Sequence, residues 1–169
     1  GESVTVPSLA QCQALGNALG HFHLISPQFP QHRFNPCGPS WWHTVTQRLL
    51  PCLSADDANL LQNELHFQAK YKNIDLPSGV IHADLFRDNA LFENDKLSGI
   101  IDFYYAGNDV LLYDVAVTIN DWCSLSDGHL DENRVNAILT AYRQQRELNH
   151  LEIKAFPTLL RAAALRFWL

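Results

Sequence analysis

Four polar side chains follow two short apolar runs near the middle of the chain. His82 and Asp84 come directly after the first run, and Asn89 lies five residues beyond Asp84. Asp102 ends the second run. A loop carboxylate can accept the proton of a hydroxyl group, and carboxylate and amide oxygens are ligands that suit Mg²⁺. These are the groups that transfer of a phosphoryl group to an alcohol requires.

Each of these side chains is predicted to have a separate role. Asp84 stands on a tight loop after a strand and is predicted to be the proton acceptor. Asn89 and Asp102 are predicted to bind the metal, because a β-hairpin with residues 94–96 as its turn brings Asp102 back beside Asn89. His82 is interpreted as scaffold that bonds to the loop backbone and fixes Asp84, although histidine also serves as an acid or base.

Taken singly, these residues have a plain alternative, because Asp and Asn are common in loops, where they form Asx-turns. The joint pattern is more specific. His-x-Asp-Leu-x-x-x-Asn follows a strand, and a hairpin and a second strand ending in Asp come after it. This is the catalytic-loop pattern of the protein kinases and their relatives. The sequence therefore favours a kinase-like enzyme.

Longer runs make the resemblance narrower. The loop resembles that of the aminoglycoside phosphotransferase-like kinases, which also include choline, fructosamine and homoserine kinases. Within that group the whole chain is most similar to the homoserine kinases, and the runs Phe-Tyr-Tyr and Asn-Asp-Trp-Cys are the most distinguishing parts. The stretches that carry this resemblance are 79–89, 97–106, 112–123 and 160–169.

The resemblance implies a complete reaction. Asp84 is the catalytic base, Asn89 and Asp102 hold Mg²⁺, and ATP is the co-substrate. The acceptor is the γ-hydroxyl of L-homoserine, which gives O-phosphohomoserine for threonine biosynthesis. Asp114 matches the acidic position that braces the catalytic loop in kinase-like folds; the alternative is a carboxylate on the wet face of a helix.

Homoserine carries an ammonium and a carboxylate, so its site needs charges of both signs. Several charged and aromatic residues could supply the site, although each could instead be an ordinary surface or core residue. Choline, an aminoglycoside or fructosamine is the rival acceptor; choline favours an aromatic cage and an aminoglycoside an acidic pocket. The candidate acceptor-binding residues are Arg87, Asp88, Tyr104, Tyr105, Asp121, Trp122 and Arg166.

Apolar periodicity, caps and turn residues predict a mostly helical α+β chain. Pro157 either kinks the last helix or lies in the first turn of a new one. The two indoles at 41 and 42 are expected to anchor the core rather than form a ligand wall. Helices are predicted at 8–24, 41–51, 54–71, 110–123, 131–147 and from 149 onward, a strand at 80–81, the hairpin at 90–101, and loops at 25–39 and 103–109.

The composition excludes several classes of protein. The net charge of −6 offers no basic field for nucleic acid or an acidic membrane surface. No apolar run reaches the length of about 18 residues that spans a bilayer. The four cysteines fit no zinc pattern and are expected to be buried or half-buried thiols in the cytoplasm. His21 and His23 are two residues apart on a helix and point to different faces, so a metal pair is not expected.

The 169 residues are expected to form one catalytic C-terminal lobe of a kinase-like fold. They contain no glycine-rich phosphate loop, and none of the four lysines lies in a strand of the Val-Ala-Ile-Lys type. Both ends look cut, so we expect a fragment that lacks the N-terminal nucleotide-binding lobe and the extreme C-terminus, and is inactive alone. The alternative is a non-catalytic module that self-associates through the surface left by the missing lobe.

Overall fold

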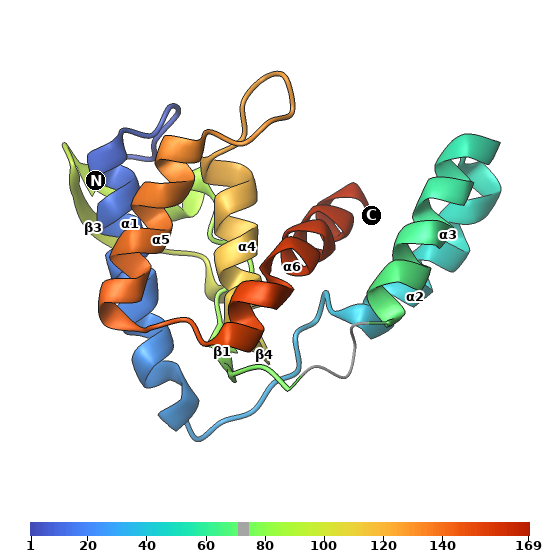
Figure 1. Cartoon of the computed structure of the whole chain (residues 1–169), viewed down its shortest axis with the longest axis horizontal. Coiled ribbons are helices and arrows are strands. Elements are labelled where there is room, and N and C mark those ends of the chain that lie inside the picture. The colour runs from blue at the N-terminus through green and yellow to red at the C-terminus, as the bar shows by residue number, and fades with distance from the viewer. Residues whose placement is uncertain (71–74) are drawn as a thin grey trace.

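The computed structural model describes residues 1–70 and 75–169. The chain is mostly helical, with two small antiparallel sheets of two strands each, which confirms the predicted fold class. Figure 1 shows α1 and α5 at one end of the molecule, α2 and α3 at the other, and α4 and α6 between them. The helices are α1 (Leu9–Ile25), α2 (Pro39–Leu49), α3 (Ala55–Ala69), α4 (Leu111–Trp122), α5 (Glu132–Gln145) and α6 (His150–Trp168); the strands are β1 (Ser78–Ile81), β2 (Ala90–Glu93), β3 (Lys96–Ile100) and β4 (Gly107–Val110).

Helix α4 is the centre of the fold. All but two of its twelve residues are buried, and a helix that is buried on every side must have apolar partners on every side. One core lies between α4, α1 and α5 and includes Leu15, Ile119 and Ile138. A second core lies between α4, α6 and the α2–α3 pair and includes Trp42 and Ala163. The loop of residues 82–89, which we call the catalytic loop after its predicted role, is bonded to α4, the most buried of the described helices.

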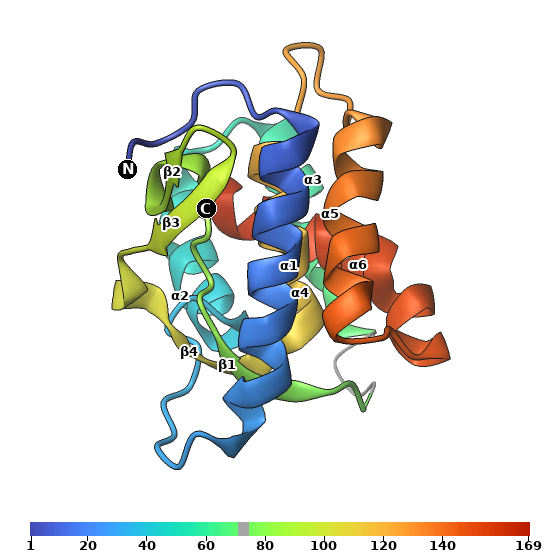
Figure 2. The same ribbon diagram turned by 90° about the vertical axis from the view of Figure 1, so that its left-hand side faces the viewer.

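Helices α1 and α5 lie side by side along their length (Figure 2). Gly16 and Gly20 of α1 face the backbone of α5. A Cβ atom on Gly16 would lie 2.4 Å from the carbonyl oxygen of Ile138, and one on Gly20 would lie 2.7 Å from that of Tyr142. Real Cβ atoms do not approach so closely, so the two glycines set the distance between the helices.

Four of the predicted helix starts are confirmed by their caps, whereas α2 begins at Pro39, two residues before its predicted start and inside the segment predicted to be loop. Ser8 and Asn149 form capping boxes with the third residue of α1 and α6, and the side chains of Ser54 and Asp131 accept backbone amides of α3 and α5. Pro157 lies inside α6, which runs through it as one helix, so the alternative that it lies in the first turn of a new helix is wrong. The predicted end of the third helix near Tyr71, like Lys72, lies outside the described residues.

Strand β4 was expected to be loop. Gly107 to Val110 pairs antiparallel with β1, with Ser78 opposite Val110 and Ile81 opposite Gly107. Gly, Asn and Asp have low strand propensity, so the pairing depends on the backbone groups of β1 and leaves no signal in the local sequence. The β2–β3 hairpin is confirmed, and Asn94 takes the left-handed conformation in its turn.

Two further expectations can be checked against burial. Trp42 is buried in the second core, as predicted. All four cysteines are free thiols, and three are buried, but Cys52 is exposed. No helix in the described part of the chain combines the length and apolar character needed to cross a bilayer.

Candidate active site

The catalytic loop joins β1 to β2. Ala83 takes a left-handed backbone conformation, with φ at 65°, which turns the chain sharply before Asp84. Leu85 is fully buried, and its carbonyl accepts the indole N–H of Trp122 at 3.2 Å. The loop thus has one apolar anchor in the core, while the carboxylate of Asp84 remains 19% exposed.

The ring of His82 bonds to backbone on both sides. Its Nε2 lies 2.9 Å from the carbonyl oxygen of Ile101, and its Nδ1 lies 3.3 Å from the amide nitrogen of Asp84. A carbonyl only accepts and an amide N–H only donates, so Nε2 carries the proton and Nδ1 accepts. The ring also packs on Phe103 at a centroid distance of 4.6 Å. His82 therefore ties the catalytic loop to the end of β3.

Asp114 of α4 lies under the catalytic loop and is fully buried, rather than on a wet helix face. Its two oxygens accept the amides of His82 and Ala83, each at 2.7 Å. Burial raises the pKa of this carboxyl group, but the hydrogen bonds that it accepts from His23 and from the His82 amide outweigh burial, so the pKa is lowered. The ionised carboxylate holds both loop amides in place.

A chain of buried hydrogen bonds continues from Asp114 to the start of α6. His23 Nε2 lies 3.1 Å from Asp114, and Tyr142 lies 2.9 Å from His23 Nδ1. Arg146 donates to the Tyr142 hydroxyl at 3.2 Å and to Glu152 at 2.7 Å. Because the carboxylate only accepts, His23 donates through Nε2, and the tyrosine hydroxyl donates to its Nδ1. These hydrogen bonds therefore run in one direction, from Arg146 through Tyr142 and His23 to Asp114.

The sequence did not predict this chain of buried hydrogen bonds. His23 was considered only with His21 as a metal pair; His21 is exposed and His23 is buried, so the two do lie on different faces. The available signal was that His23 continues the apolar stripe of Leu15 and Leu19, where a polar side chain needs a buried partner. The sequence does not say which partner.

Asn89 and Asp102 lie on the other side of the loop from Asp114. The side-chain amide of Asn89 donates to the carbonyl of Asp84 at 2.8 Å and to its carboxylate at 3.3 Å. The Ile101 amide bonds to the Asn89 carbonyl at 3.0 Å, which joins the two segments. Asp102 is exposed, has φ at 60°, and accepts the Tyr104 amide at 3.3 Å.

These oxygens fit a divalent cation of the Mg²⁺ type. The Asn89 nitrogen is turned toward Asp84, which leaves the amide oxygen on the other side, and the Asp102 carboxylate faces solvent. No cluster of three or more His, Cys, Asp or Glu suited to a metal occurs among the described residues. A pair of oxygen ligands agrees with Mg²⁺, which commonly binds one or two protein ligands plus substrate phosphates.

The carboxylate of Asp84 is affected by both sides of the site. Burial raises its pKa, and the negative charges of Asp102 and Asp88 add to the rise. The positive charge of Arg166 opposes this rise. Burial has the largest effect, so the pKa lies above its ordinary value, in the direction expected of a proton acceptor.

Three candidate acceptor residues have partners within the protein. Arg87 forms an ion pair with Asp121 at 3.0 Å, and its own amide also bonds to that carboxylate at 2.8 Å. Trp122 is fully buried in the first core. Each of these residues thus has partners within the protein, and its role in binding the acceptor stays a prediction.

The other four candidates lie near the catalytic loop. Asp88 and Tyr104 are exposed, and Tyr105 is half-buried. Tyr105 stacks edge-on with Tyr104 and lies beside the guanidinium of Arg166, which approaches Asp84. The structure thus brings Arg166 and the two tyrosines to the side of Asp84, whereas Asp88 lines a pocket together with Arg87 and Asp121.

Comparison with known proteins adds a family assignment. Residues 1–148 match the family described as "Phosphotransferase enzyme family". The chain is 43% identical over 169 residues to the homoserine kinase of Methylobacillus flagellatus, covering all of this chain and 53% of that protein. It is 42% identical over 168 residues to that of Neisseria meningitidis serogroup B, covering 99% of this chain and 55% of that protein. The chain spans about half the length of these curated relatives.

Solved structures share the fold at low identity. An amicoumacin kinase in complex with AMP-PNP, Ca²⁺ and Ami superposes with a TM-score of 0.76 at 18% identity, covering 99% of this chain and 53% of that one. A microcompartment-associated aminopropanol kinase superposes with a TM-score of 0.64 at 23% identity, covering 98% and 55%. The overall arrangement of helices and small sheets is thus that of these small-molecule kinases.

Proposed function

The chain belongs to the phosphotransferase enzyme family, and from that premise we propose that residues 1–169 are the catalytic C-terminal lobe of a homoserine kinase. The full enzyme transfers the γ-phosphate of ATP to the hydroxyl of L-homoserine. The observation that carries this proposal is the 43% identity to a homoserine kinase over the entire length of the chain. The site geometry supports the reaction type, and the relatives support the acceptor.

Asp84 accepts the proton of the acceptor hydroxyl as that oxygen attacks the γ-phosphorus. Its carboxylate is partly exposed at the mouth of the loop, and its backbone is fixed by the His82 ring. The Asn89 amide holds one carboxylate oxygen at 3.3 Å, so the carboxylate has a defined direction before the acceptor arrives.

Asn89 and Asp102 would hold Mg²⁺, which when bound neutralises charge on the ATP phosphates. Both residues are joined by the backbone bond between Ile101 and Asn89, so their spacing is set by the hairpin. The neighbour bound to AMP-PNP and Ca²⁺ is consistent with a divalent cation in this fold.

Acceptor recognition is assigned to candidate residues on the loops of residues 82–89 and 102–106. Asp88 supplies a carboxylate for the homoserine ammonium, and Tyr104 and Tyr105 form an aromatic wall. The acceptor and ATP are the proposed partners, and the cytoplasm is the proposed location. We also expect the isolated 169-residue chain to be inactive, because it spans about half of its relatives.

The decisive experiment measures phosphorylation by the full-length enzyme against L-homoserine, choline, ethanolamine, an aminopropanol and an aminoglycoside. We expect homoserine to have the highest kcat/KM, and Asp84→Asn to lose turnover. Preference for another acceptor would refute the homoserine assignment and leave the kinase reaction intact. Wild-type turnover by Asp84→Asn would refute the mechanism.

The rival function, a non-catalytic module that self-associates, makes a different prediction for the isolated chain. Sedimentation velocity combined with Mg-ATP titration distinguishes the two. Self-association without metal-dependent nucleotide affinity, in the full-length protein as well as in the chain, would support the module.

A further inference from the structure

The guanidinium of Arg166, near the C-terminal end of α6, lies against the catalytic loop. Its Nη1 donates to the carbonyl of Ala83, and its Nη2 lies 3.5 Å from Oδ1 of Asp84. The rings of Tyr105 and Phe167 flank it, with centroids 5.1 and 4.5 Å from Cζ. The Arg166 side chain is only 4% exposed. Two of its donors are thus directed at the loop, and little of its surface is open to a ligand.

Ala83 is the residue that most needs such support. Its left-handed conformation costs a residue other than glycine about 1 kcal/mol or more, and it persists only where the surroundings fix it. Asp114 accepts the Ala83 amide, and Arg166 donates to the Ala83 carbonyl. The peptide groups on both sides of this residue are therefore held by buried charged side chains, one from α4 and one from α6.

Helix α6 is connected to the same loop at both of its ends, indirectly at its first turn and directly near its last. Its first turn carries Glu152, which joins the buried chain through Arg146 that ends at Asp114. Its last turns carry Arg166, which reaches the loop directly. A helix is stiff over this length, so α6 fixes the direction from which the guanidinium approaches Asp84.

We propose that Arg166 is a positioning residue for the catalytic base and not a ligand of the acceptor. It fixes the Ala83 carbonyl and the direction of the Asp84 carboxylate. This replaces the sequence-based expectation that Arg166 binds the acceptor. The inference rests on the proposed role of Asp84 as proton acceptor, but it does not depend on which alcohol is the acceptor.

The test uses the full-length enzyme with whichever acceptor the wild type phosphorylates fastest. Arg166→Gln is expected to lower kcat roughly 10- to 100-fold, the size of effect that a small misplacement of a reacting group produces, while the KM of acceptor and ATP stays within about twofold. Arg166→Lys is expected to recover part of the loss, because it keeps a charge and donors but lacks the planar fork.

Arg161→Gln is the matched control. Arg161 lies on the same helix, is 51% exposed and pairs with Glu64 on α3, away from the loop. Its removal should leave kcat unchanged. A large rise in acceptor KM with unchanged kcat in Arg166→Gln would make Arg166 an acceptor ligand and overturn the proposal. An equal loss of kcat in both variants would overturn it too, because the effect would then belong to α6 in general.

A second measurement needs no turnover. Hydrogen exchange of the unliganded full-length protein should be faster at the amides of 83–85 in Arg166→Gln than in Arg161→Gln. Equal exchange in both variants would contradict the positioning role even if the enzyme prefers another acceptor. Failure of the homoserine assignment is seen separately, as preference of the wild type for a different alcohol.

Discussion

The two halves of the candidate site are built in different ways. The base half, residues 82–84, is tied to α4 by Asp114, and through Asp114 to α1 and α5; Arg166 ties it to α6. The metal half consists of Asn89 and Asp102 on short loops. Asp102 is exposed, and its carboxylate accepts a neighbouring amide within its own turn.

Because of this difference, substitutions in the two halves should affect the stability of the fold and the activity of the enzyme to different extents. We call the base half the braced half, because Asp114 and Arg166 hold it in place. A side chain that braces it supports both the fold and the reaction, because its buried partners cannot form hydrogen bonds to water when it is removed. A side chain in the metal half can lose its function while its neighbours remain hydrated. Changes at the side chains that brace residues 82–84 should therefore alter stability together with activity, and changes in the metal half should alter activity alone.

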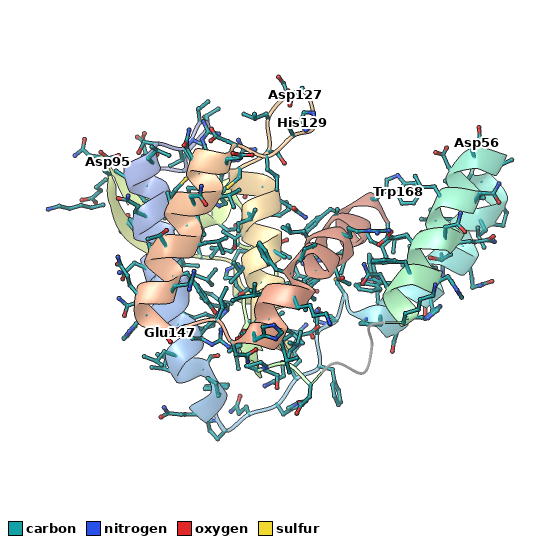
Figure 3. All side chains as sticks on the ribbon, in the orientation of Figure 1. Asp56, Asp95, Asp127, His129, Glu147 and Trp168 are labelled. Carbon is teal, nitrogen blue, oxygen red and sulfur yellow. The ribbon has the colours of Figure 1, made fainter. Side chains whose placement is uncertain are left out.

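The largest effect on activity is expected from Asp84, where the two halves meet. Asp84→Asn in the full-length enzyme should lower kcat by about 10²- to 10⁴-fold, the range for loss of a general base. Its thermal unfolding midpoint should change little, because the carboxylate is partly exposed. Asp127→Asn, in the exposed loop after α4 (Figure 3), is the control and should retain full turnover.

The metal half is tested by Asp102→Ala. A metal contributes several kcal/mol of charge stabilisation, so kcat/KM should fall by about 100-fold or more, with a higher Mg²⁺ requirement. The free energy of unfolding should fall by no more than about 1 kcal/mol, the value of one lost capping bond. A collapse of stability in this variant would contradict the proposed division between the halves.

The braced half is tested by Asp114→Asn. An amide can accept only through its oxygen, so one of the His82 and Ala83 amides loses its acceptor. The expected cost is about 2–3 kcal/mol of unfolding free energy for a buried donor without a partner, measured by urea denaturation. Activity should fall as well. An unchanged denaturation midpoint would show that the loop does not depend on this carboxylate.

Asp114 also predicts how stability depends on pH. Its pKa is lowered in the folded protein, so its ionised form stabilises the fold at pH values above the ordinary carboxyl pKa. That contribution is lost as the pH falls through the lowered folded value. Urea midpoints between pH 7 and pH 3 should therefore fall more steeply for the wild type than for Asp114→Asn. Parallel curves would rule out Asp114 as the source.

The smallest effect is expected at Tyr142, which lies farther along the chain of buried hydrogen bonds than Asp114 and His23. Tyr142→Phe removes only the hydroxyl that bonds to His23 and Arg146. The expected loss is about 1 kcal/mol of unfolding free energy, with kcat reduced by less than in Asp114→Asn. A larger loss of activity in Tyr142→Phe than in Asp114→Asn would place the main brace at α5 and not at α4.

The hairpin, and the approach of Asn89 to the segment that carries Asp102, were predictable because their signals are local. Asp84, Asn89 and Asp102 are linked by a short motif and one β-hairpin, and a hairpin brings its own ends together. The helix caps were predictable for the same reason. The candidate metal ligands therefore follow from a stretch of about twenty residues.

The braced half was only partly predictable. Its partners are distant in sequence: His23 and Tyr142 are 119 residues apart, and Arg166 and Ala83 are 83 apart. Local periodicity showed that these positions lie on helices but not which side chains meet. The pairing of Arg87 with Asp121 was hidden for the same reason, and β4 formed because β1 offered free backbone groups.

The close contact of α1 and α5 has a consequence for how this lobe can evolve. Gly16 and Gly20 touch neither the catalytic loop nor the proposed ligands, yet a single methyl group at either position would separate the helices. His23, one turn beyond Gly20, could then no longer reach Tyr142. The spacing of the two helices therefore restricts substitution at Gly16 and Gly20. A survey of tolerated substitutions should show that these two positions accept as few changes as the catalytic loop.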